Sequence, residues 1–511
     1  MAYRVLLIRP NHSNGKKNPY GTFPLGLAYI AAVLRESGHE VQIMDLSKEN
    51  VDMESVAQSI ERFNPDMFGL TAISFEYVFV KKLASWLKEK YAKPIILGGQ
   101  LASHSPTLVV ENSDVDICVI GEGELTIVDL LNNMDKLGQV KGIVYRDGEV
   151  TRSTSPRELI QDLDSVPFPA YDLVDMDEYS EFLKTDIYMS PKYLPKLPKG
   201  QEHRVMAVMS GRGCPFVCGY CTQMFESIRK RSIENVMEEM TLLKEKYGIT
   251  IINFVDELFF FSKKYTREFC EKVAPMKMGW YGNARIDTVD KELLTLISKS
   301  GCLTIGYGVE TASAEILKRM HKKITPKRIE RTMRETLEVG LPTSIGLILG
   351  YPGETRETVQ ETIDMLKRVG FPGTKFHYVT PYPGSPLYNE CVANGTISDE
   401  LSYLESLGDG TGPYKFRFNF TDMSDQELSD LLHESSRKVM RNYLWYLVTH
   451  PKYLFRYLRY KDFMNPVYYY YSQWRRPTNY SRAAKATALT KAATTNISSQ
   501  SSPKHAPDMG S

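Results

Sequence analysis

Short apolar runs and longer amphipathic segments alternate twice along the chain. In the first 150 residues the apolar runs span residues 4–9, 40–45, 67–74, 94–99 and 116–121, and the segments between them have helical spacing. From residue 201 to residue 395 the alternation returns, with runs at 205–209, 251–255, 280–285, 303–310, 343–350 and 374–379. Such alternation is typical of mostly parallel sheets covered by helices. It predicts two α/β domains whose ligands bind at the carboxyl ends of the strands.

The stretch between these two domains has a different pattern. Residues 142–150 predict a hairpin with Asp147 and Gly148 at its turn. Residues 151–200 are rich in proline, which argues against long regular structure. These prolines are Pro156, Pro167, Pro169, Pro191, Pro195 and Pro198. We interpret residues 151–200 as a linker that crosses the interface between the two domains.

The C-terminal part of the chain is predicted to be helical and then disordered. Ser424 and Glu427 have the spacing of a capping box that opens a helix. Residues 443–474 are unusually aromatic with arginines interleaved, and we interpret them as a helical cap on the second domain. Two alternatives stay open for this segment: a cover that admits a large hydrophobic substrate, or a weak contact with a membrane surface. Residues 481–511 have almost no large apolar side chains and should be disordered.

Composition narrows the class of protein. The 511 residues are 42% hydrophobic and 24% charged, and the net charge of +1 gives no reason to expect a nucleic-acid partner. Seven unevenly placed cysteines do not form a secreted disulfide framework. The first apolar run follows Met1 almost directly, so we expect no signal peptide, and no run approaches the roughly 20 residues of a membrane span. A reducing cytoplasm is the expected compartment.

Three of the cysteines stand close together after one apolar run. Cys214, Cys218 and Cys221 have the spacing C-x3-C-x2-C. Thiolates are the ligands of iron–sulfur clusters, and three of them leave one iron of a four-iron cluster open for a small molecule. The alternative, a structural zinc loop, would want a fourth Cys or His nearby, which the local sequence does not offer.

With the aromatic Tyr220 before the last cysteine, this motif resembles the radical S-adenosylmethionine superfamily. The flanking domains resemble its cobalamin-binding branch, and the resemblance runs from about residue 3 to residue 390. It implies an N-terminal doubly wound, Rossmann-like cobalamin domain followed by a partial (β/α)6 barrel. We expect the cobalamin domain in residues 1–150, the linker in 151–200, the barrel in 201–395, the helical aromatic-rich region in 396–480 and the tail in 481–511.

Polar residues follow the predicted strands of the barrel. They are Asp256, Glu257, Arg285 and Glu310. S-adenosylmethionine carries an ammonium, a carboxylate and two ribose hydroxyls, for which carboxylate and guanidinium side chains are suitable partners. By resemblance we assign Arg285 and Glu310 to this ligand, with Tyr220 and with Asp256 or Glu257 near it. The alternative for each charged residue is a structural ion pair.

The strand ends of the first domain carry small residues instead. The resemblance implies cobalamin contacts at Thr71, Ser74, Gly98, Gly99, Gly121 and Glu122. A lower axial imidazole would resemble D-x-H-x-x-G after the first strand. His12 and Gly15 fit that pattern, but Pro10 replaces the aspartate that would orient the imidazole. We therefore expect cobalamin to bind without a histidine ligand.

The resemblance implies a cobalamin-dependent methyltransferase that acts on an unactivated carbon of a hydrophobic or secondary-metabolite substrate. Its cofactors would be a 4Fe–4S cluster, S-adenosylmethionine and cobalamin, with an electron donor such as flavodoxin or ferredoxin. One alternative is radical oxidative cyclisation, resembling the anaerobic magnesium-protoporphyrin ester cyclase. An alternative of another class is a carrier of cobalamin or cluster without turnover. No residue is assigned to catalysis itself.

Overall fold

The N-terminal sheet has seven strands in the order β2-β1-β3-β4-β5-β6-β7. The computed structural model describes residues 2–10, 23–47, 51–180, 203–371, 376–408 and 416–449. The strands are β1 (Arg4–Arg9), β2 (Glu40–Asp45), β3 (Met67–Thr71), β4 (Ile95–Gly98), β5 (Ile117–Val119), β6 (Ile143–Asp147) and β7 (Val150–Ser153). The first five are parallel, whereas β6 and β7 pair antiparallel, as the hairpin prediction required.

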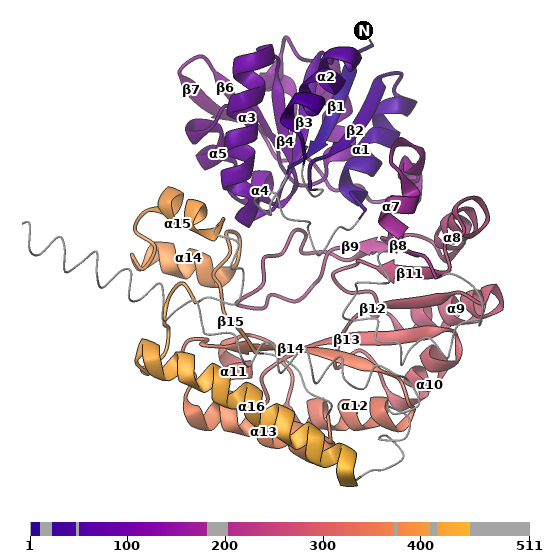
Figure 1. The fold of residues 1–511 in the computed structure, drawn as a ribbon, viewed down its shortest axis with the longest axis vertical. Helices are drawn as coiled ribbons and strands as arrows, with labels where there is room; N and C mark the ends of the chain where they lie inside the picture. The colour runs from indigo at the N-terminus through magenta and orange to yellow at the C-terminus, as the bar shows by residue number, and fades with distance from the viewer. Residues whose placement is uncertain are drawn as a thin grey trace, which may run out of the picture. The chain divides into compact units, whose positions relative to one another are not determined.

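Helices cover both faces of this sheet because its strands are apolar on both sides. On one face Val5 and Leu7 pack with α1 (Leu25–Glu36) and α6 (Gly123–Asn132). On the other face Leu6 and Ile8 share a hydrophobic cluster with three further helices. These helices are α2 (Met53–Phe63), α3 (Tyr77–Tyr91) and α5 (Pro106–Asn112). The doubly wound architecture is therefore confirmed, with β1 to β7 in indigo and purple in Figure 1.

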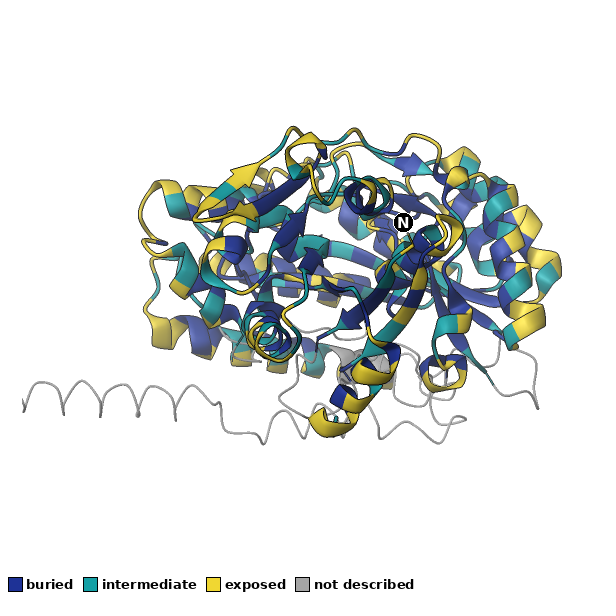
Figure 2. Cartoon of the chain, turned by 90° about the horizontal axis from the view of Figure 1, so that it is seen from above, coloured by how far each residue is buried: buried dark blue, intermediate teal, exposed yellow. Residues whose placement is uncertain are grey.

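The second sheet has six parallel strands in the order β15-β14-β13-β12-β11-β8, an open partial barrel. Its strands are β8 (Val205–Val208), β11 (Ile251–Phe254), β12 (Gly279–Arg285), β13 (Cys302–Glu310), β14 (Thr343–Leu349) and β15 (Phe376–Tyr378). The intervening helices are α8 (Ile233–Tyr247), α9 (Lys263–Val273), α10 (Lys291–Lys299), α11 (Ala314–Arg319), α12 (Pro326–Glu338) and α13 (Arg356–Val369). The six predicted strand and helix units are all present. In Figure 2 their strands are mainly dark blue and their outer helix faces yellow.

A small two-stranded ribbon that was not predicted flanks the three cysteines. In it, β9 (Gly211–Arg212) pairs antiparallel with β10 (Arg229–Lys230). The two strands approach so closely that a Cβ on Gly211 would lie 2.7 Å from the carbonyl oxygen of Arg229. This ribbon closes the loop at its base and brings two arginines together.

The described part of the linker contacts one helix of each domain. The N–H group of Ala170 donates to the carbonyl oxygen of Ala28 in α1 at 3.0 Å. The next residue, Tyr171, donates its hydroxyl to Glu239 of α8 at 2.5 Å. After α7 (Met176–Ser180), residues 181–202 lie outside the described part of the chain. These contacts agree with the interpretation of this segment as a linker that crosses the interface between the two domains.

Within the described residues after β15, three helices occur: α14 (Pro386–Ala393), α15 (Glu400–Leu407) and α16 (Asp425–Thr449). Leu404 of α15 belongs to the same hydrophobic cluster as α3, and Lys81 of α3 pairs with Glu405 at 2.9 Å. The predicted capping box at the start of α16 is confirmed, since Ser424 N–H donates to Glu427 at 2.8 Å and Glu427 N–H donates back to Ser424 at 3.3 Å.

Residues 1–449 form one compact unit, and residues 450–511 lie outside the described part of the chain. Most of the aromatic segment and the whole tail are therefore not described, and the alternatives for them stay predictions. Among the described helices, none is long and apolar enough to cross a membrane. The predicted domain boundaries also stay predictions.

Candidate functional site

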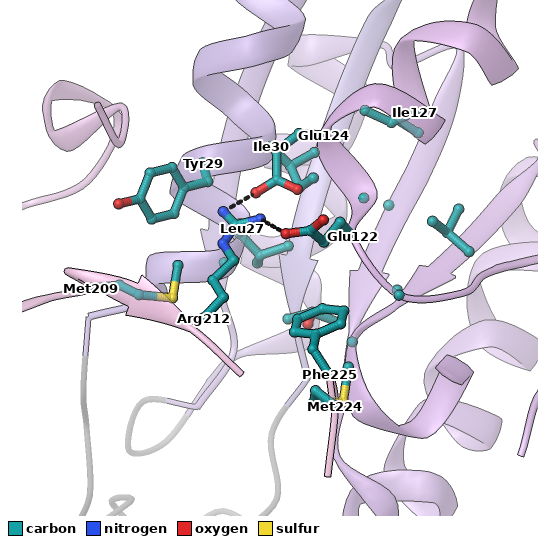
Figure 3. A pocket seen from close by; sticks show the side chains of 18 of the residues that line it. Leu27, Tyr29, Ile30, Glu122, Glu124, Ile127, Met209, Arg212, Met224 and Phe225 are labelled. Atoms are coloured by element: carbon teal, nitrogen blue, oxygen red, sulfur yellow. Dashed lines mark hydrogen bonds and ion pairs between the residues drawn. The ribbon is translucent and has the colours of Figure 1, made fainter. Parts of the chain in front are cut away.

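A cavity of about 310 Å³ lies between the carboxyl edge of the N-terminal sheet and the first strands of the barrel. Thr71, Gly98 and Gly99 line it from the N-terminal sheet, and Met209 and Glu257 line it from the barrel. Figure 3 shows this cavity, with Met209, Met224 and Phe225 of the barrel facing residues of α1 and α6. The cavity is therefore shared by the two domains. Of the residues predicted for S-adenosylmethionine, Asp256 and Glu257 line it, whereas Tyr220, Arg285 and Glu310 do not.

Several glycines stand among the apolar side chains of the N-terminal wall of the cavity. Gly99 follows β4 with a φ of +86°, and a Cβ there would lie 2.9 Å from both the Ala72 carbonyl oxygen and Thr71 Oγ1. A Cβ on Gly69 would lie 2.6 Å from a methyl group of Leu7, deeper in the same wall. Only glycine leaves this space open, so the wall fits a bulky cofactor that approaches the backbone closely.

The other residues predicted to contact cobalamin differ in whether they line the cavity. Gly121 and Glu122 line the cavity with Thr71, Gly98 and Gly99. Ser74 is buried at the start of the short helix η1 (Ser74–Glu76) and is not part of the cavity lining. Its Oγ finds no hydrogen-bond partner among the residues that the structure describes. His12 lies outside the described residues, so the prediction about the axial ligand is untested.

Four buried charges form what we call the interface ion cluster: Glu122, Glu124, Arg212 and Arg229. Arg212 of β9 reaches Glu122 at 2.7 Å and Glu124 at 2.6 Å (Figure 3). Arg229 of β10 reaches Glu122 at 2.9 Å. The Glu122 carboxylate is thus already paired with two guanidinium groups of the barrel. Its role toward cobalamin stays a prediction, and the two arginines were missed because nothing in the sequence links them to Glu122.

The three predicted cluster ligands lie on the loop after β8. Cys218 is buried, Cys214 is half-buried and Cys221 is exposed. Desolvation raises the pKa of the Cys214 thiol, and the nearby charges of Glu257 and Cys218 act in the same direction. No three His, Cys, Asp or Glu side chains in the described ranges meet at a single metal position. The thiolates of a cubane each bind a different iron, so this donor set fits a four-iron cluster without meeting at one point.

The predicted ligands of S-adenosylmethionine surround this loop. Tyr220 donates its hydroxyl to Glu310 at the end of β13, at 2.9 Å. Arg285, at the end of β12, places its guanidinium 4.0 Å from the centre of the Phe216 ring, which belongs to the cysteine loop. The structure therefore brings Tyr220, Arg285 and Glu310 together beside the cysteines. It also places Lys322 among them, since its Nζ donates to both Glu310 and Tyr220 at 2.9 Å.

Asp256 and Glu257 differ in burial and in the hydrogen bonds that their carboxylates accept. The Asp256 carboxylate is buried and accepts from Ser210 N at 2.9 Å, Ser210 Oγ at 2.7 Å and Lys230 Nζ at 2.9 Å. Glu257 is open to the cavity. Its pKa is raised, because burial disfavours the charged carboxylate and the charge of Asp256 lies nearby, against the lowering effect of a hydrogen bond from the Met224 backbone. Both residues line the cavity, and Glu257 is the more exposed of the two.

Comparison with known proteins supports a cobalamin-binding domain followed by a radical S-adenosylmethionine domain. Residues 15–131 match the B12 binding domain family, and residues 208–366 match the radical SAM superfamily. The chain is 33% identical over 408 residues to an uncharacterized methyltransferase of Pyrococcus horikoshii, covering 77% of this chain and 84% of that one. It is 28% identical over 418 residues to the anaerobic magnesium-protoporphyrin IX monomethyl ester cyclase of Cereibacter sphaeroides, covering 78% of this chain and 65% of the relative.

A solved structure has the same fold. The radical S-adenosylmethionine methyltransferase TsrM from Kitasatospora setae superposes with a TM-score of 0.64 at 18% identity, covering 77% of this chain and 78% of that one. The chain belongs to the cobalamin-binding radical S-adenosylmethionine family. It is a radical enzyme whose cofactors are a 4Fe–4S cluster, S-adenosylmethionine and cobalamin. The hypothesis of a carrier without turnover is therefore set aside.

Proposed function

We propose that this enzyme transfers a methyl group to an unactivated carbon of a hydrophobic or secondary-metabolite substrate. The observation that carries the proposal is the single cavity shared by the glycine wall of the N-terminal sheet and by Glu257 beside the cysteine loop. A substrate in that cavity would meet groups held by either wall. Two curated relatives are described as methyltransferases, from Pyrococcus horikoshii and Streptomyces wedmorensis.

The residues of the chain would divide the binding work between them. When bound, the cluster with S-adenosylmethionine supplies a radical that removes a hydrogen atom, and cobalamin supplies the methyl group. Cys214, Cys218 and Cys221 would hold the cluster. Arg285 would pair with the carboxylate of S-adenosylmethionine, and Glu310 with its ammonium or ribose hydroxyls.

The other side of the cavity would hold cobalamin. Gly98 and Gly99 would let the backbone approach its nucleotide tail, with Thr71, Ser74, Gly121 and Glu122 nearby. Apolar side chains of the cavity, among them Met209 and Phe225, would exclude water from the reacting carbon. A flavodoxin or ferredoxin would supply electrons, and a reducing cytoplasm would be the compartment.

Radical oxidative cyclisation is the second candidate function. It is favoured by the cyclase relative of Cereibacter sphaeroides, which matches 78% of this chain. Cyclisation removes hydrogen from the substrate without adding a methyl group, so the two functions differ in the mass of the product.

The test is anaerobic incubation of the reconstituted enzyme with cell extract and S-adenosylmethionine that carries a deuterated methyl group. We expect a metabolite to gain the labelled methyl, with formation of both 5′-deoxyadenosine and S-adenosylhomocysteine. The Cys218→Ala variant is the matched control and should give no labelled product. A metabolite that loses hydrogen and gains no label would favour cyclisation and contradict methyl transfer.

A further inference from the structure

The turn between α11 and α12 has an unusual backbone. His321 and Lys323 both have left-handed conformations, with φ values of +54° and +52°. Glu310, at the end of β13, also has a positive φ of +65°. Non-glycine residues keep such conformations only where their surroundings enforce them, and they gather at functional sites. Lys322 lies between two of these residues, so its position is tightly determined.

Lys322 connects the two parts of the proposed S-adenosylmethionine site. Its Nζ donates to Glu310 Oε1 at 2.9 Å and to the Tyr220 hydroxyl at 2.9 Å. Its own carbonyl oxygen accepts a hydrogen bond from the Arg285 guanidinium. One residue therefore contacts the carboxylate, the phenol and the guanidinium that we assign to the same ligand.

The same turn also holds the cysteine loop. The N–H group of Gly219, which lies between Cys218 and Cys221, donates to the carbonyl oxygen of Met320 at 2.9 Å. Tyr220 is the next residue and directly precedes Cys221. The turn thus holds two neighbouring residues of the loop. Met320 binds Gly219 through a backbone hydrogen bond, and the Lys322 side chain binds the Tyr220 hydroxyl.

Lys322 is buried beside β13. Only 4% of the residue is exposed. A Cβ on Gly308 would lie 2.6 Å from Glu310 Oε1 and 3.3 Å from Lys322 Nζ. Glycine at position 308 therefore leaves room for the ion pair, because a side chain there would collide with the Glu310 carboxylate.

We propose that Lys322 is a positioning residue that couples the binding of S-adenosylmethionine to the iron–sulfur loop. By holding Glu310, Tyr220 and Arg285 in one arrangement, it fixes the ligand's charged groups relative to Cys221. The proposal rests on the cofactor set and not on methyl transfer, so its test needs no substrate and its failure would leave the proposed function standing.

The test compares Lys322→Met, Lys322→Arg and the control Lys323→Met, which changes the exposed neighbouring lysine. Each protein is reconstituted anaerobically, and its iron content and its dissociation constant for S-adenosylmethionine are measured. The electron paramagnetic resonance spectrum of the reduced cluster is then recorded with and without S-adenosylmethionine. A role limited to folding would leave the affinity and the spectral change of the folded protein unaltered.

We expect Lys322→Met to keep its iron and to bind S-adenosylmethionine about tenfold or more weakly, as for the loss of charge-assisted hydrogen bonds. The ligand-induced spectral change should require correspondingly more S-adenosylmethionine. Lys322→Arg should recover part of the affinity, and Lys323→Met should match the wild type. Wild-type affinity in Lys322→Met would overturn the proposal.

If Lys322→Met loses its iron, Tyr220→Phe serves as the milder variant. It removes the hydroxyl that joins Lys322 and Glu310 and keeps the ring. We expect it to retain the cluster and to weaken binding of S-adenosylmethionine. Loss of iron in both variants, or unchanged affinity in Tyr220→Phe, would assign Lys322 to the support of the loop alone and overturn the coupling role.

Discussion

The two sheets present opposite kinds of surface at their carboxyl edges. The N-terminal sheet ends in glycine backbone at Gly98 and Gly99, and both residues line the cavity. The barrel ends in buried charges at Arg285 and Glu310, each held by a neighbour. Both sheets are parallel over the strands concerned, so the strand geometry is shared. The two edges therefore differ in the residues at and just after the strand ends, and not in the direction of the strands.

This contrast suggests how the enzyme separates its two organic cofactors. A large corrinoid needs room and close backbone approach, which glycine provides. A small zwitterion with a carboxylate and an ammonium needs fixed opposite charges, which paired side chains in a dry site provide. The interface ion cluster joins the two edges, because Arg212 and Arg229 of the barrel are bound by Glu122 of the N-terminal domain.

The largest expected effect concerns the cysteine loop of the barrel. Replacing Cys218 by Ala removes one of three thiolates, and we expect the protein to lose its cluster, as measured by iron and sulfide content after anaerobic reconstitution. Cys270→Ala is the control, because Cys270 is buried in the core of the barrel. Full iron content in Cys218→Ala would refute the assignment of the cluster to this loop.

On the glycine edge, Gly99→Ala should abolish stoichiometric cobalamin binding and leave the iron content unchanged. The new methyl group would lie 2.9 Å from Thr71 Oγ1 and the Ala72 carbonyl oxygen, so the wall must shift. Gly38→Ala is the matched control, since Gly38 has nearly the same φ of +84° with nothing within 4 Å. Both variants carry backbone strain of about 1 kcal/mol, and only Gly99→Ala crowds the cavity. Equal cobalamin content in the two variants would contradict the proposed wall.

The contact between the two edges can be tested with Arg212→Met. This change leaves Glu124 buried without its partner, and we expect a loss of about 3–5 kcal/mol in the free energy of unfolding, measured with urea. Arg35→Met is the control, because the Arg35–Asp172 pair at 2.9 Å is exposed and should contribute about 0–1 kcal/mol. A loss no larger than that of the control would show that the interface ion cluster does not hold the domains together.

Much of the fold was predictable from the sequence, because local periodicity decides strands and helices. The six strands of the barrel and the hairpin of β6 and β7 all occur where the pattern of apolar residues placed them. The pairing of the glycine edge with the cysteine loop around one cavity was not predictable. It depends on contacts such as Arg212 with Glu122, which are 90 residues apart.

Within the candidate site, too, only residues with a local sequence signal could be predicted. Arg285 and Glu310 were predicted because each follows an apolar run, which is a local signal. Lys322 carries no such signal, since it lies in a charged segment between two helices. Only the buried turn reveals that its ammonium group contacts Glu310 and Tyr220. Asp256 and Glu257 both line the cavity, and only the structure shows that Ser210 and Lys230 already bind the Asp256 carboxylate.

The smallest expected effect is a pH dependence at the barrel edge. Burial raises the pKa of Glu354 to about 8, against the lowering effect of the Gly350 and Tyr351 N–H groups. A raised pKa favours the protonated form in the folded state, so its contribution to stability is lost as the pH rises from about 4.5 towards 8. Between pH 5 and 7 the loss should be on the order of 2 kcal/mol.

The measurement is the midpoint of thermal unfolding of wild type and Glu354→Gln at both pH values. Because Gln does not ionise, the wild type should lose stability relative to the variant as the pH rises. Parallel behaviour of the two proteins would show that Glu354 does not titrate in this way. The matched control, Glu357→Gln, changes an exposed glutamate in the first turn of α13.

The central claim is that residues after the strands of both sheets, at Gly98 and Gly99 and at Met209 and Glu257, line one cavity, so that cobalamin and the cluster with S-adenosylmethionine act on the same substrate. The most direct measurement is pulsed electron paramagnetic resonance of the protein with cob(II)alamin and the reduced cluster present together. The account predicts a magnetic interaction between the two unpaired spins, which disappears in Cys218→Ala. Spectra that are the simple sum of the two isolated centres would contradict it.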